Sequence, residues 1–400
     1  MDPATEKASQ SAKGIFDIFL TYLRLGCYSF GGPVAHLAYY KELLVTRRAW
    51  LSEARYAELL GLCQFIPGPS SSQLGFAIGW HRGGLLGACV AWTGFTLPSA
   101  LLMMTAAYGL IQIGDAAKPV IGGLLLAAVA VVANAVFSLA KHLCPDGPRI
   151  AIALLSAATV LYLPGNTAQV AVILAGGLAA QLIYRQRPAE SPPNEPQNHR
   201  LRRRILVALL ALYTILLATS FLLPASSPLS FYGMIYRAGA LVFGGGHVVL
   251  PLLQDSVVAG GWVNQSDFLA GYSAAQALPG PLFTFAAFLG VTASPLTPEW
   301  LSGLIALVSI FLPGMLLLVA LLPLWSKLRS TAWAQAGLMG ANAAVVGLLV
   351  AAFINPVWVH GIHDWMDVAI AALAFFCLFK LRAPAWSVVF ACGLIGFLMG

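Results

Sequence analysis

Two arginines at repeated positions are the side chains in this sequence whose type and spacing best suit a chemical role. Arg24 lies six residues before Phe30, and Arg237 lies six residues before Phe243, each within apolar sequence. A charge in a membrane segment is costly and is a functional hypothesis by default. A guanidinium group can donate two parallel hydrogen bonds to a tetrahedral oxyanion. The pair therefore predicts an anion site, although an acidic partner or the membrane surface would also satisfy each arginine.

Helix-breaking residues follow both arginines. Phe-Gly-Gly occurs at 30–32 and 243–245, and Pro-Gly-Pro occurs at 67–69 and 279–281. Irregular backbone at membrane depth persists only where protein or a water-filled cavity covers it. A helix that restarts there directs N–H groups and a positive dipole end at the break, which favours an anion. The predicted anion site therefore includes these glycines: Gly31, Gly32, Gly68, Gly244, Gly245 and Gly280.

Polar side chains flank both Pro-Gly-Pro segments. Gln64 and Gln276 each precede the segment by three residues, and their amides could bind an oxyanion or form interhelical hydrogen bonds. After the first segment, Ser70, Ser71 and Ser72 are candidate N-caps of the restarting helix. We include Ser70 and Ser71 in the predicted substrate site.

Four further ionisable residues could couple or gate transport. Glu42 and Asp255 occupy equivalent positions, but both lie towards the ends of their segments, which favours solvated helix ends over a gating or coupling role. His36 and His247 follow the two Phe-Gly-Gly segments at positions that are not equivalent, and either imidazole could carry a proton near neutral pH.

The motifs of common enzymes are missing from the sequence. It has no zinc signature, P-loop or nucleophile elbow. We therefore predict no catalytic residues, no metal site and no cofactor.

The composition is that of a membrane protein with many segments. Hydrophobic residues make up 59% of the 400 residues and charged residues 9%, against about 25% charged residues in a soluble domain. The apolar segments predict an all-α polytopic protein with about thirteen membrane elements, some of them broken or re-entrant. The first residues are polar and no cleavage site follows, so we expect no removable signal peptide.

An ordered series of matches indicates that the chain is duplicated. R-x-G-x-x-x-F-G-G at Arg24 recurs at Arg237 with an offset of 213 residues (237 − 24), and Q-x-x-P-G-P at Gln64 recurs at Gln276 with an offset of 212 (276 − 64). We predict an N-terminal transport repeat at 1–185, a cytoplasmic linker at 186–203, a connecting transmembrane helix at 204–223 and a C-terminal repeat at 224–400.

Charge placement predicts that the two repeats have opposite orientations. The loop at 45–55 contains Arg47, Arg48 and Arg55, whereas the equivalent second-half loop contains no Lys or Arg. The positive-inside rule places the first loop in the cytoplasm and the second outside, and the extra helix supplies the inversion. The N-terminus is then cytoplasmic and the C-terminus periplasmic. The net charge of +7 follows from this topology and does not require nucleic acid as a partner.

These residues together favour an inverted-repeat secondary transporter for a small oxyanion in the lipid bilayer. An anion channel is the alternative function, because polar breaks can also form a selectivity filter. The sequence is also compatible with a homodimer.

The motifs also resemble those of a known family. "RLGCYSFGGPVAHL", "CQFIPGPSSSQLG", "RAGALVFGGGHVVLP" and "AQALPGPLFTFAAFLG" resemble the chromate ion transporter (CHR) family in its long, two-half form. The resemblance implies export of chromate across the bacterial inner membrane and chromate resistance, with sulfate as the close structural analogue. It covers nearly the whole chain apart from the linker and the extra helix.

The resemblance also implies which residues are functional. The second half has Gly246 where the first has Pro33, and Leu282 where the first has Ser70, so equal binding by both halves is not implied. The family's motif positions in this sequence are Arg24, Phe30, Gly31, Gly32, Gln64, Pro67, Gly68 and Pro69, and Arg237, Phe243, Gly244, Gly245, Gln276, Pro279, Gly280 and Pro281.

Overall fold

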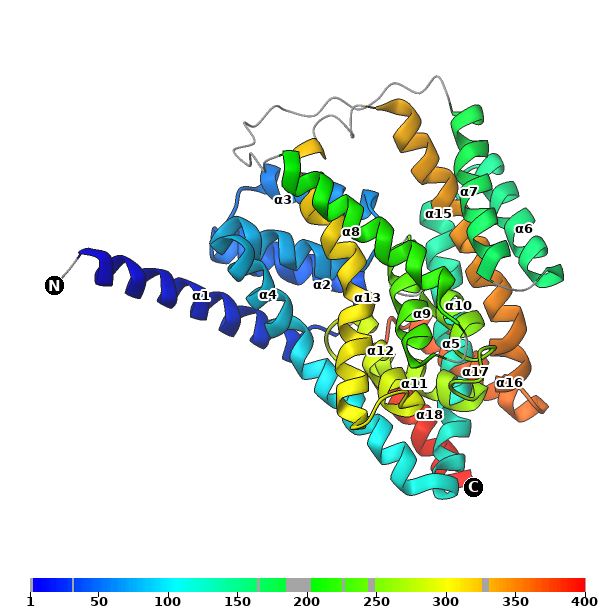
Figure 1. The fold of residues 1–400 in the computed structure, drawn as a ribbon. Coiled ribbons are helices and arrows are strands. Elements are labelled where there is room, and N and C mark those ends of the chain that lie inside the picture. Colours follow the sequence, from blue (N-terminus) through cyan, green and yellow to red (C-terminus); the bar gives the residue numbers. More distant parts are fainter. Residues whose placement is uncertain are drawn as a thin grey trace.

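The chain folds into a bundle of helices, as its apolar periodicity predicts. The computed structural model describes residues 3–30, 32–163, 166–184, 203–224, 227–243, 249–325 and 331–399, and every regular element within them is helical (Figure 1). Five helical segments are long and apolar enough to cross a membrane: Ser70–Ile113, Lys118–Leu143, Arg204–Leu222, Glu299–Leu324 and Ala332–Gly361. The all-α membrane class is confirmed.

The first-half elements run from α1 to α7. They are α1 (Pro3–Tyr28), α2 (Gly32–Tyr40), a π-helical turn (Lys41–Arg47), α3 (Glu53–Phe65), α4 (Ser70–Ile113), α5 (Lys118–Leu143), α6 (Gly147–Tyr162) and α7 (Asn166–Ile183). α4 is two helices joined at a kink, because Gly83 and Gly84 have non-helical backbone angles. The predicted linker lies almost wholly outside the described residues.

The second-half elements follow α8 (Arg203–Leu222), which corresponds to the predicted connecting helix. They are α9 (Pro228–Leu241), α10 (Val249–Val257), α11 (Gln265–Ala277), a 3-10 turn (Leu282–Thr284), α12 (Phe285–Ala293), α13 (Glu299–Leu321), α15 (Ala332–Ala352), α16 (Val359–Gly361), α17 (Trp365–Phe379) and α18 (Ala385–Met399).

The helices stop at all four predicted breaks. Break 1 separates α1 from α2, break 2 separates α3 from α4, break 3 separates α9 from α10, and break 4 separates α11 from the turn that leads into α12. Glycine and proline account for these stops, since neither residue stabilises a helix interior. The sequence repeat is thus also a repeat of local structure.

Equivalent glycines bring equivalent helices into close contact. A Cβ atom at Gly26 of α1 would lie 2.6 Å from the carbonyl oxygen of Phe95 in α4. In the second half, a Cβ atom at Gly239 of α9 would clash with the carbonyl oxygen of Ile310 in α13. Small residues at helix crossings allow this backbone approach. The pairs α1 with α4 and α9 with α13 are therefore built in the same way.

The two halves interlock through α5 and α15. α5 of the first half packs against α17 and α18 of the second, and α15 of the second half packs against α6 and α7 of the first. Gly123 of α5 contacts the backbone of Cys392, and Gly340 of α15 contacts the backbone of Gly176. Neither repeat is therefore a separate packing unit.

Candidate functional site

Reciprocal backbone hydrogen bonds join the four breaks. The Gly68 N–H in break 2 donates to the Val242 carbonyl in break 3, with N and O 2.8 Å apart. The Gly280 N–H in break 4 donates to the Ser29 carbonyl in break 1 across 2.9 Å. Gly68 is equivalent to Gly280, and Ser29 to Val242, so the same contact is made twice with the halves exchanged. The breaks of both halves therefore meet in one region.

Glycine is required at both donors. Gly68 has φ +126° and Gly280 has φ +94°, where L side chains are strained. An added Cβ would lie 2.6 Å from Gln73 Nε2 at Gly68 and 2.8 Å from Ser99 Oγ at Gly280. Both glycines were expected to face an anion, but their N–H groups already bind the opposite half. Their position makes them connectors between the halves.

The start of α4 is buried and lacks a side-chain cap. The helix begins at Ser70 with Pro69 in the N-cap position, and no side-chain cap bonds its first turn among the residues that the structure describes. The prediction that Ser70, Ser71 or Ser72 caps this helix is wrong, because all three lie inside the first turn. Proline offers no side-chain acceptor, so N–H donors of this turn keep their hydrogen-bonding capacity. Ser71 and Ser72 are only 4% and 2% exposed.

His36 links break 1 to this helix start. Its Nε2 lies 3.0 Å from the Ser29 carbonyl oxygen, and its Nδ1 lies 3.3 Å from Ser71 Oγ. The imidazole is buried and meets the Phe95 ring edge-on, with ring centroids 5.2 Å apart. Within the described residues, the buried Oγ atoms of Ser29 and Ser72 have no hydrogen-bond partner. The first half thus gathers polar groups at its breaks.

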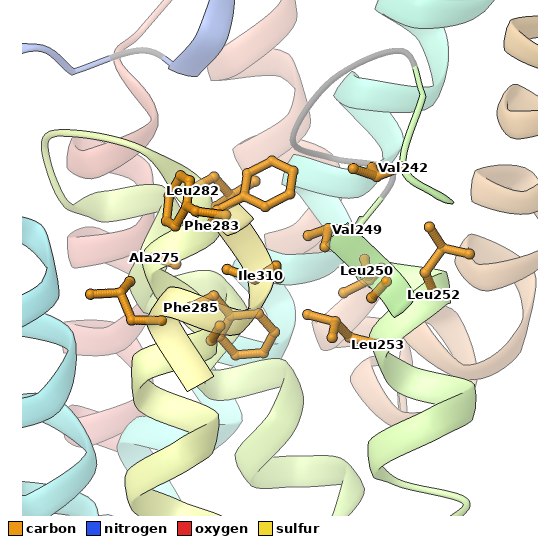
Figure 2. Packing of buried hydrophobic residues seen from close by; sticks show 14 of the residues in the cluster. Val242, Val249, Leu250, Leu252, Leu253, Ala275, Leu282, Phe283, Phe285 and Ile310 are labelled. Carbon is orange, nitrogen blue, oxygen red and sulfur yellow. The ribbon is translucent and has the colours of Figure 1, made fainter. Parts of the chain in front are cut away.

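The equivalent region of the second half is apolar. Val242, Val249, Leu282, Phe283 and Phe285 lie in one buried cluster (Figure 2). The backbone here begins with a 3-10 turn in which the Thr284 N–H donates to the Pro281 carbonyl, with N and O 3.0 Å apart. The Thr284 hydroxyl donates to the same carbonyl oxygen across 2.9 Å. Like α4, this restart lacks a side-chain cap among the described residues, but both donors of Thr284 bind within their own turn.

The two predicted arginines have different surroundings. Arg24 is exposed, and no hydrogen bond or ion pair joins it to any described residue. Arg237 is half-buried, with its Cζ 4.5 Å from the centroid of the Phe221 ring. It lines a cavity of about 10 Å³ together with Gln169 and Ser256, which is room for about one water molecule and too small for a tetrahedral oxyanion. In this conformation the arginines do not share one site.

The remaining predicted substrate residues are only partly described. Gln64 is exposed, whereas Gln276 is half-buried and is a hydrogen-bond partner of Tyr272. Gly32 has φ +72°, which glycine tolerates best. Gly31, Gly244, Gly245 and His247 lie outside the described residues.

The equivalent acids Glu42 and Asp255 have different surroundings. Glu42 is exposed and forms an ion pair with Arg47, with Oε1 and Nε 2.8 Å apart. Asp255 is half-buried, and its Oδ2 accepts a hydrogen bond of 2.6 Å from Gln169 Nε2. Gln169 is 1% exposed and also contacts the Pro251 carbonyl oxygen at 3.2 Å. The solvated-end interpretation therefore fits Glu42 and does not fit Asp255.

Gln169 is a polar residue that the sequence reasoning passed over. It lies in the first-half helix α7 and reaches α10 of the second half. The available signal was an amide inside the apolar stretch that forms α7. Such a residue often marks an interhelical hydrogen bond.

Two other kinds of site, an apolar cavity and a metal-binding cluster, receive no support as the anion site. A cavity of about 550 Å³ between α4, α8 and α13 is lined by mainly apolar side chains such as Leu85, Phe311 and Met315, and none of the described residues that line it is charged. Among the described residues, no three His, Cys, Asp or Glu side chains come close enough to hold a metal ion.

Comparison with known proteins adds an independent finding. The family model described as "Chromate transporter" matches residues 16–181 and 229–397. The chain is 28% identical to "Chromate transport protein" of Pseudomonas aeruginosa over 99% of this chain and 95% of that protein. It is 28% identical to "Probable chromate transport protein" of Synechococcus elongatus over 90% and 88%, and 27% identical to "Chromate transport protein" of Cupriavidus metallidurans over 84% and 81%. No solved structure matches the chain significantly.

Proposed function

Because this chain belongs to the chromate transporter family, we propose that it exports chromate from the bacterial cytoplasm across the inner membrane and so confers chromate resistance. Relatives named as chromate transport proteins match 84–99% of its length, which supports the substrate class. Sulfate and chromate are both tetrahedral dianions, so sulfate is the first competitor to test.

The observation that carries the proposal is the reciprocal pairing of the breaks. Gly68 with Val242, and Gly280 with Ser29, place irregular backbone from both halves together in the interior. Discontinuous helices at the interface between repeats are where secondary transporters bind substrates, with helix N-termini directed at anionic groups. The breaks are therefore the proposed route and seat of the anion.

Inverted orientation of the halves would give alternating access. The basic residues Arg47 and Arg48 of the first-half loop favour the cytoplasm, and their second-half counterparts are uncharged. One half can then rock against the other while the connected breaks stay near the centre. In this mechanism the N-terminus is cytoplasmic and the C-terminus is periplasmic.

Each arginine has a distinct part in this mechanism. Exposed Arg24 adds positive potential to the approach and raises the local concentration of a dianion. Arg237 is held against Phe221 beside Gln169, so it acts on the anion only in a conformation that opens this cavity.

Chromate uptake by everted membrane vesicles tests the proposal. Vesicles containing the protein should accumulate chromate with saturable kinetics, and vesicles without it should not. Excess sulfate should compete, and selective collapse of the proton gradient or the membrane potential identifies the driving force. Flux that does not saturate would indicate an anion channel. Transport of sulfate without chromate would overturn the substrate.

A further inference from the structure

The two halves differ in polarity at equivalent positions of the breaks. At five equivalent positions the first-half residue is polar and its second-half counterpart is apolar, although the backbone breaks are the same. The pairs are Ser29 and Val242, His36 and Val249, Ser70 and Leu282, Ser71 and Phe283, and Gln73 and Phe285. The structure buries both members of four of these pairs and leaves Ser70 half-buried, with Ser29 and His36 at 0% exposure and Val242 and Val249 also at 0%. Exposure therefore does not account for the difference.

Backbone donors differ in the same direction. Both restarts lack a side-chain cap among the described residues, but the Pro281 carbonyl oxygen accepts from the Thr284 N–H in a 3-10 turn, whereas the Pro69 carbonyl oxygen accepts one residue later, from the Gln73 N–H of α4. A buried helix start that lacks a cap leaves N–H groups that need an acceptor. An anion is the ligand that such a helix start binds best.

Two buried serine hydroxyls are a second, independent observation that points to a ligand at this helix start. Ser29 Oγ and Ser72 Oγ are buried and have no partner within the described residues. A carbonyl oxygen only accepts hydrogen bonds, so His36 must donate from Nε2 to Ser29, and a neutral imidazole then accepts at Nδ1 from the Ser71 hydroxyl. His36 thereby orients Ser71 and holds break 1 beside the start of α4. The hydroxyls of Ser29 and Ser72 remain as donors.

We propose that the chain has one oxyanion seat, at the start of α4, and that the second half has no counterpart to it. The seat consists of the first-turn N–H groups of α4 and the hydroxyls of Ser29 and Ser72. The second half contributes the Gly280 N–H, which fixes the Ser29 carbonyl, and an apolar surface around Phe283 and Phe285 (Figure 2). This inference rests on the proposed function, because it assigns the dianion to one half of the same central region.

The apolar character of the second-half region equivalent to the start of α4 has a physical consequence. Two seats of equal affinity would hold two dianions close together, and their mutual repulsion would be strong in a medium of low dielectric constant. An apolar cluster in place of a second seat also keeps water out of the second-half break, and a low local dielectric constant strengthens each hydrogen bond to an anion. One dianion for each chain is therefore the expected stoichiometry.

Equilibrium binding of chromate and sulfate to the purified full-length protein tests the seat. Isothermal titration should give one site per chain for the wild type. Ser29→Ala and Ser72→Ala should each weaken chromate binding roughly tenfold or more, since each removes a hydrogen bond to a charged group. Thr284→Ala is the matched control at the position equivalent to Ser72, and it should change the dissociation constant less than about twofold, because Thr284 bonds its own backbone.

The outcomes of the binding experiment distinguish failure of the single-seat proposal from failure of the proposed function. Two sites per chain, or equal weakening by Ser72→Ala and Thr284→Ala, would overturn the single seat while chromate transport stands. A wild-type protein that binds neither dianion would overturn the proposed function and the seat together. Size-exclusion profiles and thermal unfolding of each variant identify loss of fold, and the wild-type stoichiometry decides the question without any variant.

Discussion

The amide nitrogen of Gly68 lies 2.8 Å from the carbonyl oxygen of Val242, so a break of the first half is hydrogen-bonded to a break of the second. The equivalent bond from Gly280 to Ser29 repeats the contact with the halves exchanged. A movement of one half therefore acts directly on the breaks of the other. These bonds connect the predicted substrate region to the interlocked long helices around it.

Alanine at either connecting glycine should damage both stability and transport. Gly68→Ala and Gly280→Ala force a side chain into positive φ and into contact with a neighbour. Each substitution should destabilise the protein by about 1–3 kcal/mol, and transport should fall with it. Thermal unfolding in detergent and chromate uptake in vesicles measure the two effects.

Gly122→Ala is the matched control. Gly122 lies inside α5, and an added Cβ would meet no atom within 4 Å. Alanine also stabilises a helix interior relative to glycine. Destabilisation as large as that of Gly68→Ala would show that the break geometry is not the cause.

The equivalent acids should respond differently to neutralisation. Asp255→Asn removes the negative charge that accepts the 2.6 Å bond from buried Gln169 and leaves one acceptor oxygen, whereas Glu42→Gln removes an exposed ion pair with Arg47. Exposed ion pairs contribute little, about 0–1 kcal/mol, so Glu42→Gln should transport almost normally. Asp255→Asn should lower the transport rate at least severalfold. Equal rates for the two variants in the vesicle assay would contradict a coupling or gating role for Asp255.

Arg24 should act through its charge and not through a bidentate hydrogen bond to the anion. Its exposed side chain has no partner among the described residues, so Arg24→Lys should keep most transport. Arg24→Gln should raise the chromate KM by roughly a few-fold, and added salt should erase the difference. A large loss in Arg24→Lys would instead indicate a bidentate contact with the anion.

A cysteine at position 47 should report the orientation of the first half. The exposed native thiols of Cys27 and Cys89 are first replaced by alanine to remove background labelling. An impermeant maleimide should then label Arg47→Cys in everted vesicles and not in intact cells, because basic loops stay in the cytoplasm. Labelling from outside the cell would reverse the proposed topology.

The breaks could be predicted from the sequence because the cause is local. Gly68 and Pro69 disfavour a continuous helix through local backbone geometry, and their repetition at Gly280 and Pro281 marks equivalent points. The pairing between breaks is different, since Gly68 and Val242 are far apart in the chain and only tertiary packing joins them. The same holds for the interlocking of α5 and α15 with helices of the opposite half.

The surroundings of single polar residues were harder to predict. Serines after Pro-Gly-Pro suggest a cap, but Pro69 takes the cap position and leaves Ser70 inside the helix. Arg24 and Arg237 are identical in sequence context, yet one is exposed and the other faces Phe221 and Gln169. Those neighbours come from α8 and α7, and no pattern around either arginine reports which helices pack there.

The loop before α6 should make stability depend on pH. Asp146 Oδ2 lies 2.6 Å from Arg149 Nη2, and its Oδ1 caps α6 and accepts from the Tyr184 hydroxyl. The Arg149 hydrogen bonds hold the pKa of the Asp146 carboxyl well below its usual range. A lowered folded pKa contributes stability above the unfolded pKa of about 4, and this contribution disappears as pH falls through the folded pKa. Asp146→Asn keeps a capping side chain and removes the charge, so it should cost about 1 kcal/mol near neutral pH. The apparent Tm of the variant should lie below that of the wild type at neutral pH and converge with it in acid, and a gap that persists in acid would assign the effect to packing.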